Sequence, residues 1–304
     1  MMKILITGAA GFIASHIADR YLALGHQVII IDDLSTGSEK NRPAQTQFYR
    51  ESILHPKMAD IIRQEKPDIV NHHAAQIDVR KSVADPAADA AINILGTLKL
   101  LEVCREVGVK KVLFASSGGA IYGDQETYPA DEKHRTEPQS PYGITKLTVE
   151  KYLQFYFWTY GMPFVALRYA NVYGPRQNSH GEAGVVAIFT EKLLKGETPL
   201  INGDGTQTRD YVYVGDVVHC NAQALQSDVQ GIFNVGTGVE TDVNTLAGEL
   251  IRLTGVSPTV LQHGPEKAGE QKRSCLKPGV LQKKPPTPLS EGLKKTVEWF
   301  QSRK

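Results

Sequence analysis

The sequence predicts an α/β protein built on a doubly wound parallel sheet, with a smaller lobe formed mainly by the C-terminal part of the chain. Short β-rich apolar runs alternate with longer helical patterns, and this alternation is typical of βαβ units and a parallel sheet. Residues 28–31 are apolar at every position, as expected for a strand covered by helices on both sheet faces. After about residue 175, glycine and proline punctuate the chain, which indicates a lobe and not a separately folding domain.

Five apolar runs are expected to form the central strands, with helices between them. They are KILIT (3–7), QVIIIDD (27–33), DIVNHHAA (68–75), KVLFASS (111–117) and FVALRYANV (164–172). An amphipathic stretch at residues 290–300 predicts a closing helix. We expect residues 1–175 to form a nucleotide-binding domain that carries the catalytic residues. Residues 176–304 are expected to form the lobe, with some strands and helices returning to the sheet.

Composition excludes several classes of protein. Of the 304 residues, 41% are hydrophobic and 22% charged, which rules out a mainly disordered chain. The formal net charge is +1, from 34 basic and 33 acidic residues, so no overall field favours nucleic acid or an anionic membrane. Cys104, Cys220 and Cys275 show no CxxC spacing, which argues against a disulfide frame or a metal site and favours a reducing compartment, with the cytoplasm as the default.

Neither a signal peptide nor a membrane span is expected. The apolar run near the N-terminus covers only residues 4–6 before Thr7 and Gly8 interrupt it, so it is interpreted as the first strand. No apolar stretch approaches the roughly 20 residues that cross a bilayer.

The string TGAAGFIAS, at residues 7–15, follows the first expected strand and opens the first helix. Gly8 and Gly11 lie in the turn, and Ala14 stands where a third glycine is common. Such a turn lets backbone amides approach a diphosphate at a helix N-terminus. The second strand ends in Asp32, about 20 residues further on, where a carboxylate can accept hydrogen bonds from ribose hydroxyls. Because that carboxylate would repel a 2′-phosphate, the sequence predicts NAD and not NADP.

The string SPYGITK, at residues 140–146, predicts a helix start with an N-cap candidate, Ser140, and a proline at the first helical position. Tyr142 and Lys146 are four residues apart and therefore share one face. A cation beside a phenol lowers its pKa, so that a tyrosinate can act as a base near neutral pH. The serine-rich strand end FASSGGAIYG lies about 25 residues upstream, where α/β sheets place ligand sites.

Together these elements resemble the extended short-chain dehydrogenase/reductase family over nearly the whole chain, and within it the UDP-glucose 4-epimerase group. The matching strings are IDDLSTG, HHAAQIDVRKSVADP, NILGTLKLLE, SSGGAIYGD, SPYGITK, LRYANVYGPR, GDGTQTRDYVYVGDV and FNVGTG. The resemblance implies a glycine-rich NAD turn, a catalytic Ser/Thr, Tyr and Lys set, and a nucleotide sugar bound in the C-terminal lobe.

The resemblance also implies a role for individual residues. Tyr142 and Lys146 would carry the chemistry, Phe12 and Ile13 would contact the diphosphate of NAD, and residues 32–37 the adenosine. The expected cofactor set is Gly8, Gly11, Phe12, Ile13, Asp32, Asp33, Leu34, Ser35, Thr36, Gly37, Ser52, Ile53, His73, Ala74, Ala75, Gln76, Asn93, Tyr142, Lys146 and Ala170. The expected UDP-sugar set is Ser117, Tyr142, Asn171, Val185, Val186, Ile201, Arg209, Lys267, Glu270 and Ser274. No metal site is expected.

Three positions depart from the family pattern. Gly118 stands where the catalytic Ser/Thr is usual, so the hydroxyl is expected to come from Ser116 or Ser117. Ser52 replaces an aspartate near the adenine amine, and a serine can still accept a hydrogen bond. Lys267 replaces an arginine, which keeps the charge but loses the bidentate geometry. In related epimerases, the position of Ser274 faces the C2 substituent of the sugar, and a serine there predicts room for an acetamido group.

The expected reaction is 4-epimerisation of a UDP-hexose through a 4-keto intermediate. A 4,6-dehydratase also needs an acid and base pair after the serine-rich strand, and Gly118 and Gly119 stand there instead. Two alternatives remain open: another NAD-dependent nucleotide-sugar enzyme, such as a UDP-glucuronate decarboxylase or epimerase, and a catalytically silent protein that binds NAD and a sugar nucleotide.

Two further features have structural interpretations. His72 and His73 are adjacent on one strand and so point to opposite sheet faces, which favours packing over metal binding. The aromatic run at residues 152–160 is more apolar than one buried face requires. In the family, the helix after the catalytic tyrosine and the one at about residues 89–107 pair with their copies in a second subunit, so a homodimer is expected.

Overall fold

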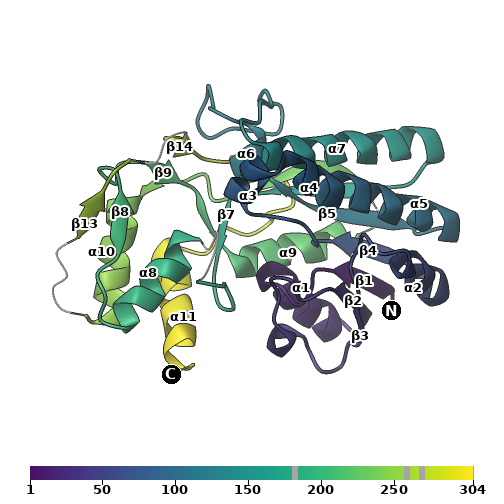
Figure 1. Cartoon of the computed structure of the whole chain (residues 1–304), viewed down its shortest axis with the longest axis horizontal. Coiled ribbons are helices and arrows are strands. Elements are labelled where there is room, and N and C mark those ends of the chain that lie inside the picture. The colour runs from purple at the N-terminus through teal and green to yellow at the C-terminus, as the bar shows by residue number, and fades with distance from the viewer. Residues whose placement is uncertain (180–183, 227, 257–260, 267–270, 304) are drawn as a thin grey trace.

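The chain folds around a seven-stranded sheet in which every neighbouring pair of strands is parallel (Figure 1). The computed structural model describes residues 1–179, 184–226, 228–256, 261–266 and 271–303. The strand order is β11-β6-β5-β4-β1-β2-β3, and the strands are β1 (Lys3–Thr7), β2 (Gln27–Asp32), β3 (Gln47–Arg50), β4 (Ile69–His72), β5 (Lys111–Ser117), β6 (Phe164–Tyr169) and β11 (Gly231–Val235). The order reverses between β1 and β4, which confirms the expected doubly wound fold and marks the edge where such sheets bind ligands.

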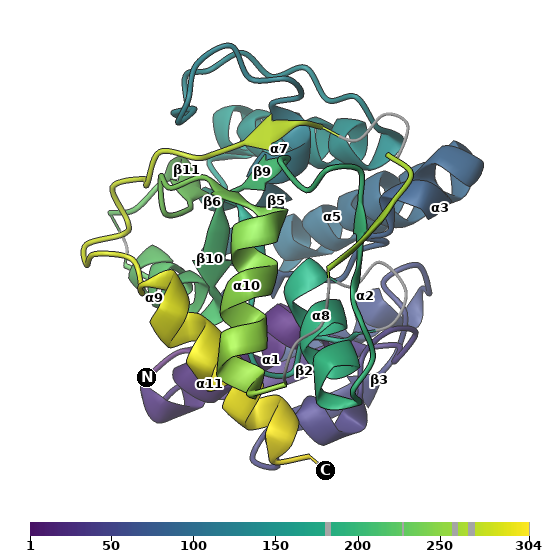
Figure 2. The same cartoon turned by 90° about the vertical axis from the view of Figure 1, so that its left-hand side faces the viewer.

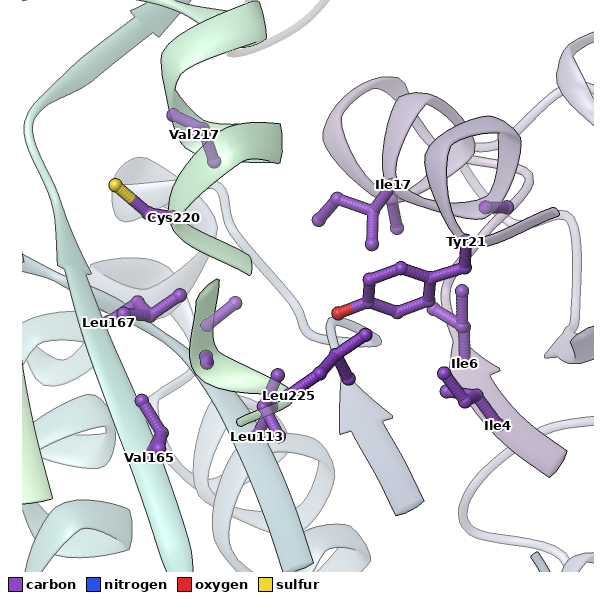
Figure 3. Close-up of a cluster of buried hydrophobic side chains, with 14 of the residues drawn as sticks. Ile4, Ile6, Ile17, Tyr21, Leu113, Val165, Leu167, Val217, Cys220 and Leu225 are labelled. Carbon is purple, nitrogen blue, oxygen red and sulfur yellow. The ribbon is translucent and has the colours of Figure 1, made fainter. Parts of the chain in front are cut away.

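Helices cover both faces of the sheet. Successive residues of each strand point to opposite faces, so each strand packs on both helical layers. Ile4 and Ile6 pack with α1 (Phe12–Ala23) and α9 (Val214–Ala224) in one buried cluster, where Tyr21 of α1 points toward the sheet (Figure 3). Leu5 lies on the opposite face, in a cluster with α2 (Lys57–Glu65), α5 (Thr97–Val107) and α7 (Pro141–Tyr160). Strands buried on both sides need apolar residues at every position, as the sequence of β2 shows.

A loop and a series of consecutive helices connect β4 to β5. The first two of these helices, α3 (Val79–Ala84) and α4 (Pro86–Ala90), begin at Asp78 and Asp85, whose side chains accept backbone N–H bonds. The π-helix η2 (Ala91–Gly96) joins α4 to α5. Single π-turns inside α-helices are frequent at functional sites. The other short helices beside the sheet are η1 (Glu39–Asn41) and α6 (Gly118–Ile121).

The lobe lies beside one end of the sheet and has its own apolar core (Figures 1 and 2). Its helices are α8 (Val185–Leu194), α10 (Val243–Thr254) and α11 (Leu289–Gln301), and α11 contains the expected closing helix. The short strands are β7 (Asn171–Tyr173), β8 (Leu200–Asn202), β9 (Thr208–Arg209), β10 (Tyr211–Tyr213), β12 (Thr241–Asp242), β13 (Gln262–Gly264) and β14 (Arg273–Ser274). Between the lobe segments the chain returns to the sheet as α9 and β11.

Across the residues whose structure is described, no helix combines the length and apolarity that crossing a bilayer requires.

Candidate active site

The turn after β1 requires glycine. Gly8 has a φ of +75°, and a Cβ added to it would lie 2.7 Å from the backbone nitrogen of Ala74. Helix α1 begins at Phe12, and its N-cap residue, Gly11, makes no side-chain cap. The backbone amides of this helix start, from Phe12 and Ile13 onward, are thus placed to bind an anionic diphosphate.

Asp32, the last residue of β2, lies directly beside this turn and is 7% exposed. One carboxylate oxygen accepts a hydrogen bond from the Ala10 N–H at 2.9 Å, and the other accepts from the Leu34 N–H at 2.8 Å. Burial raises the pKa of Asp32, and the two backbone hydrogen bonds oppose that shift. Each oxygen keeps a second lone pair, so the carboxylate can also accept from a ribose hydroxyl.

The loop after Asp32 packs on the glycine turn. The Ser38 N–H donates to the Ala10 carbonyl oxygen at 2.9 Å, and a Cβ on Gly37 would lie 2.9 Å from Ala10. Asp33, Leu34, Ser35 and Thr36 form the rest of this loop. A cleft of about 540 Å³ opens between the loop, the turn and the lobe, and its lining includes Phe12, Thr36, Gly37, Arg176 and Phe300.

Ser52 and Ile53 follow β3 at the same edge of the sheet. Ser52 Oγ accepts a hydrogen bond from the Leu54 N–H at 3.3 Å. Ile53 is 5% exposed and lies close to Gly96, where an added Cβ would come within 3.0 Å of its Cδ1. Ile53 therefore offers a ligand little side-chain surface. Ser52 offers a hydroxyl that already accepts one hydrogen bond.

Thr7 positions the end of β4. Its hydroxyl oxygen lies 2.7 Å from His72 Nδ1 and accepts hydrogen bonds from the backbone N–H groups of His73 and Ala74. His72 also contacts Thr97 Oγ1 at 2.9 Å, whereas the ring of His73 lies 3.1 Å from the Tyr169 hydroxyl. The two histidines thus have separate partners, as their adjacent positions predict. In the described part of the chain, no cluster of His, Cys, Asp or Glu is suited to hold a metal ion.

Asn93, on η2, clamps the segment that follows Ala74 and Ala75. Its Oδ1 accepts from the Gln76 N–H at 2.9 Å, and its Nδ2 donates to the Gln76 carbonyl oxygen at 2.9 Å and to Asp89 Oδ1 at 3.0 Å. Asp89 is buried and also accepts from Gln76 Nε2 and from Thr145 Oγ1. The loop that is expected to contact the nicotinamide half is therefore fixed in place by side-chain hydrogen bonds.

The catalytic candidates lie at the start of α7. Ser140 caps the helix by accepting from the Gly143 N–H at 3.1 Å, and Pro141 is the first helical residue. Lys146 Nζ donates to the Ala115 carbonyl oxygen at 2.9 Å and lies 5.7 Å from the centre of the Tyr142 ring. The Ser117 side chain lies close enough to the Tyr142 phenol to lower its pKa. The end of β5 and the first turns of α7 thus bring a phenol, a hydroxyl and an amine together.

Burial shifts the pKa values of both Tyr142 and Lys146. It raises the pKa of Tyr142 to about 12, while the hydrogen bond with Ser117 lowers this pKa and the charge of Asp89 raises it. Burial lowers the pKa of Lys146 to about 8, and Asp89 opposes that shift. The sequence predicts that Lys146 lowers the pKa of Tyr142, whereas in this structure burial is the largest cause and the pKa lies above its ordinary value.

Ser116 and Ser117 are neighbours on β5 with different surroundings. Ser116 is 3% exposed and donates to Glu150 Oε1 at 2.6 Å. Glu150 is itself held by a bidentate pair with Arg168, whose Nε and Nη2 donate at 2.9 and 2.6 Å. Successive strand side chains point to opposite faces, so only one of the two serines can face Tyr142, and in this structure it is Ser117.

Gly118 begins α6 and has no room for a side chain. An added Cβ would overlap the Cδ1 of Leu276, a fully buried residue that follows β14. The position next to it differs, because a Cβ on Gly119 would make only an ordinary contact, 3.7 Å from Asn171 Oδ1.

Asn171 is the first residue of β7, and its exposed side chain lies near Gly119. Ala170, just before it, packs partly buried against the cluster of Tyr122, Ala130 and Leu276. The substrate candidate Asn171 therefore stands at the end of β6, close to the serine-rich end of β5.

The remaining substrate candidates lie in the lobe. Val186 and Ile201 are both 1% exposed and belong to the lobe core, whereas Val185 is partly buried. Val186 and Ile201 can therefore offer a ligand mainly backbone groups. Arg209, on β9, and Ser274, on β14, are paired in register, and Ser274 is 2% exposed. Lys267 and Glu270 lie outside the described residues.

Sequence reasoning missed Asp89, Thr145, Glu150 and Leu276. A signal existed for two of them: Asp89 precedes Asn93 by four residues and Glu150 follows Lys146 by four, spacings that place each pair on one helical face. For Leu276 we find no signal, because its contact with Gly118 joins segments about 158 residues apart in the chain.

The sheet order, the glycine turn with Asp32, and the Tyr142 and Lys146 pair define a dinucleotide-binding α/β protein. The family model described as "NAD dependent epimerase/dehydratase family" matches residues 4–236. UDP-glucose 4-epimerase from Mycolicibacterium smegmatis is 43% identical over 312 residues, covering 99% of each chain.

Two solved structures are similar over the whole chain. The UDP-glucose 4-epimerase of Thermotoga maritima, solved with UDP-glucose, has a TM-score of 0.96 and 45% identity, with 99% of each chain covered. The UDP-glucose 4-epimerase of Thermus thermophilus, solved as a complex with NAD, has a TM-score of 0.93 and 42% identity, with the same coverage. This chain belongs to the NAD dependent epimerase/dehydratase family, and the resemblance found in the sequence is confirmed.

Proposed function

We propose that this protein is an NAD-dependent epimerase that inverts C4 of a UDP-hexose, interconverting UDP-glucose and UDP-galactose. The observation that carries the proposal is that Ser117, at the end of β5, lies close enough to Tyr142 to lower its pKa, with Lys146 one helical turn away on α7. The similarity to epimerases solved with UDP-glucose and with NAD supports both ligands.

The residues around the glycine turn fit NAD. Gly8 leaves the backbone open where a side chain would collide with Ala74, the start of α1 offers amides to the diphosphate, and Asp32 offers a carboxylate to the ribose. Asn93 and Gln76 hold the loop on the nicotinamide side. When bound, NAD would supply hydride-transfer chemistry at C4 of the sugar.

In this proposal, the side chains of the site carry out the proton transfer. Tyr142 Oη takes the proton of the sugar 4-hydroxyl, and Ser117 holds the phenol by a hydrogen bond. Lys146, as an ammonium held by the Ala115 carbonyl, stabilises the tyrosinate electrostatically. Because the pKa of Tyr142 is raised to about 12, chiefly by burial, we infer that the positive charge of a bound nicotinamide would contribute to ionising the phenol.

We further propose that Asn171, Arg209, Lys267, Glu270 and Ser274 contact the UDP-sugar and that N-acetylated hexoses are accepted. The small side chain at Ser274 supports the second point. The proposed division of labour assigns NAD and catalysis to residues 1–175 and the nucleotide sugar mainly to residues 176–304.

We also propose a homodimer that acts in galactose metabolism in the cytoplasm. Support for the dimer comes from exposed apolar side chains on α7: Ile144 is 50% exposed, Phe155 44% and Trp158 76%. These residues are 11 and 14 positions apart, so they lie on one face of the helix. Leu95 is also 55% exposed, and it lies on η2, which packs against α7. Light scattering measures the mass of the assembly in solution.

One experiment tests the activity. The purified protein is incubated with UDP-glucose, UDP-galactose, their N-acetylated forms and UDP-glucuronate, and the products are separated by chromatography. Interconversion of the hexoses supports the proposal. Release of carbon dioxide from UDP-glucuronate without hexose interconversion indicates a decarboxylase. Binding without any turnover indicates a silent protein, and the spectrum of bound NAD after sugar addition then separates it from an enzyme stalled at the keto stage.

A further inference from the structure

Asp89 is a buried carboxylate that none of the roles described above uses. It lies in α4, is 1% exposed, and accepts three hydrogen bonds from neutral groups. Gln76 Nε2 donates at 2.8 Å and Asn93 Nδ2 at 3.0 Å, both to Oδ1. Thr145 Oγ1 lies 3.1 Å from Oδ2. Charged residues are rarely buried to this extent unless they are partnered, so the position calls for an explanation.

The three donors come from two sides of the active site. Gln76 and Asn93 hold the segment proposed to contact the nicotinamide half of NAD. Thr145 stands between Tyr142 and Lys146 on α7, and its hydroxyl also lies 2.9 Å from the Tyr142 carbonyl oxygen. Through these contacts one carboxylate fixes the catalytic helix relative to the cofactor side.

The charge of Asp89 also affects the pKa of both Lys146 and Tyr142. Burial lowers the pKa of Lys146 and the charge of Asp89 raises it, with a result of about 8. For Tyr142, burial is again the larger cause, and Asp89 adds to the increase. Without Asp89, the amine would lose its proton at a lower pH than it does now.

Several other charged groups lie on the elements packed against α4. On α7 they are Tyr142 and Lys146 themselves, the exposed Lys151, and the buried Glu150, whose charge is compensated by its ion pair with Arg168. The π-helix η2 carries no charged residue. Arg80 and Lys81 of α3 and the cap residues Asp78 and Asp85 are not buried. Exposed charges are screened by solvent, whereas a buried charge acts over a lower dielectric. Asp89 is therefore the charge among them with the strongest expected effect on Lys146.

We propose that Asp89 is a positioning residue, which holds α7 against the nicotinamide side of the site and keeps the Lys146 amine in its ammonium form. The part that concerns turnover rests on the proposed epimerase activity. The part that concerns the ionisation of Lys146 does not depend on it.

The decisive variant is Asp89→Asn, which keeps the size and one acceptor but removes the charge. Lysines labelled with ¹³C at Cε are titrated by NMR in the full chain, and Lys146→Arg identifies the Lys146 signal. We expect the Lys146 midpoint to fall by about one pH unit, in the range that a neighbouring opposite charge produces. Asp85→Asn is the matched control, because it removes an exposed charge at the start of the same helix and asparagine also caps helices well. An unchanged midpoint in Asp89→Asn overturns the electrostatic part.

Kinetics of the NAD-loaded protein test the positioning part. In Asp89→Asn the alkaline limb of the kcat profile should move to lower pH together with the Lys146 midpoint. An inactive parent would overturn the proposed epimerisation but leave the NMR result standing. Thr145→Val keeps the charge and removes the hydroxyl link, so kcat should fall about tenfold with an unchanged Lys146 midpoint. A kcat within twofold of the parent overturns the positioning part, and this variant decides it even if Asp89→Asn does not fold.

Discussion

Leu276 occupies the space that a side chain at Gly118 would need. Leu276 is fully buried and packs with Tyr122 and Ala130, and its N–H donates to Asp210 Oδ2 at 3.1 Å. The segment after β14 is therefore docked on the first residue of α6, at the end of β5. A side chain at position 118 would have to displace Leu276 from this packing.

Gly118→Ser should destabilise the protein by about 1–3 kcal/mol, because the new side chain overpacks against Leu276. Adding Leu276→Ala should relieve the overlap, so the double variant loses less stability than the sum of the two single variants. Urea unfolding of all four proteins measures this coupling. Gly119→Ser is the matched control, because a Cβ there has room. If the losses of stability in the two single variants add up in the double variant, the side chain at position 118 does not collide with Leu276.

Ser117→Ala should lower kcat by about 10²-fold, as expected when a positioned hydrogen-bonding group is removed from a proton transfer. Its stability should change little, because Ser117 is only partly buried. Ser116→Ala should instead cost about 1–3 kcal/mol of stability, since the buried Glu150 carboxylate loses a donor. Steady-state kinetics and urea unfolding on both variants separate the effects. The reverse pattern would assign the catalytic hydroxyl to Ser116.

Tyr142→Phe should nearly abolish turnover and leave the binding of NAD and UDP-sugar largely intact. The change removes the hydroxyl that takes the proton but keeps the ring that fills the site. Calorimetric binding and single-turnover kinetics measure the two effects separately. A loss of binding that parallels the loss of activity would contradict the role of Tyr142 as the base.

The protein should accept UDP-N-acetylglucosamine as well as UDP-glucose, and Ser274→Tyr should reduce activity on the acetylated sugar more than on the plain one. A tyrosine ring would fill the space proposed for the acetamido group. The ratio of kcat/KM for the two sugars, in parent and variant, is the measurement. If the parent does not turn over the acetylated sugar, or if the ratio is unchanged in the variant, Ser274 does not set this specificity.

Acid should destabilise the protein through His72 and His73. Burial lowers the pKa of each to about 3, and the charge of Lys146 adds to the decrease. The unfolded chain takes up these protons below about pH 6.5, whereas the folded chain does not. Stability is therefore full above that pH and falls by about 1.4 kcal/mol per histidine for each pH unit below about 6.

Urea unfolding at pH 7, 6 and 5 measures how the free energy of unfolding depends on pH. A free energy of unfolding that is equal at pH 7 and pH 5 would contradict the assignment.

The central sheet could be predicted from sequence because its strands are apolar on both faces, a pattern that β2 displays in four consecutive residues. The two- and three-residue strands of the lobe gave no such signal, since their pairing depends on distant partners such as β14 and β9. The glycine turn, Asp32 and Tyr142 could be proposed from sequence because each has a short-range pattern with a chemical reason.

The choice between Ser116 and Ser117 could not be made from sequence. Strand alternation places the two side chains on opposite faces, but which face lies next to Tyr142 depends on how α7 packs. The Glu150–Arg168 pair, which accepts the Ser116 hydrogen bond, forms only in the folded protein. Likewise the pKa of Tyr142 depends on its burial, which the spacing to Lys146 does not reveal.

The position of β11 at the edge of the sheet has a consequence for biosynthesis. Val165 and Leu167 of β6 pack with Val217 and Cys220 of α9, and β6 gains its outer neighbour only when residues 231–235 pair with it. A nascent chain of which only the first 175 residues have left the ribosome therefore has an incomplete sheet, with the outer edge of β6 unpaired and the α9-facing side of α1 uncovered. Such edges and faces favour aggregation, so the nascent chain depends on the later segments, or on chaperones, until residue 235 has emerged.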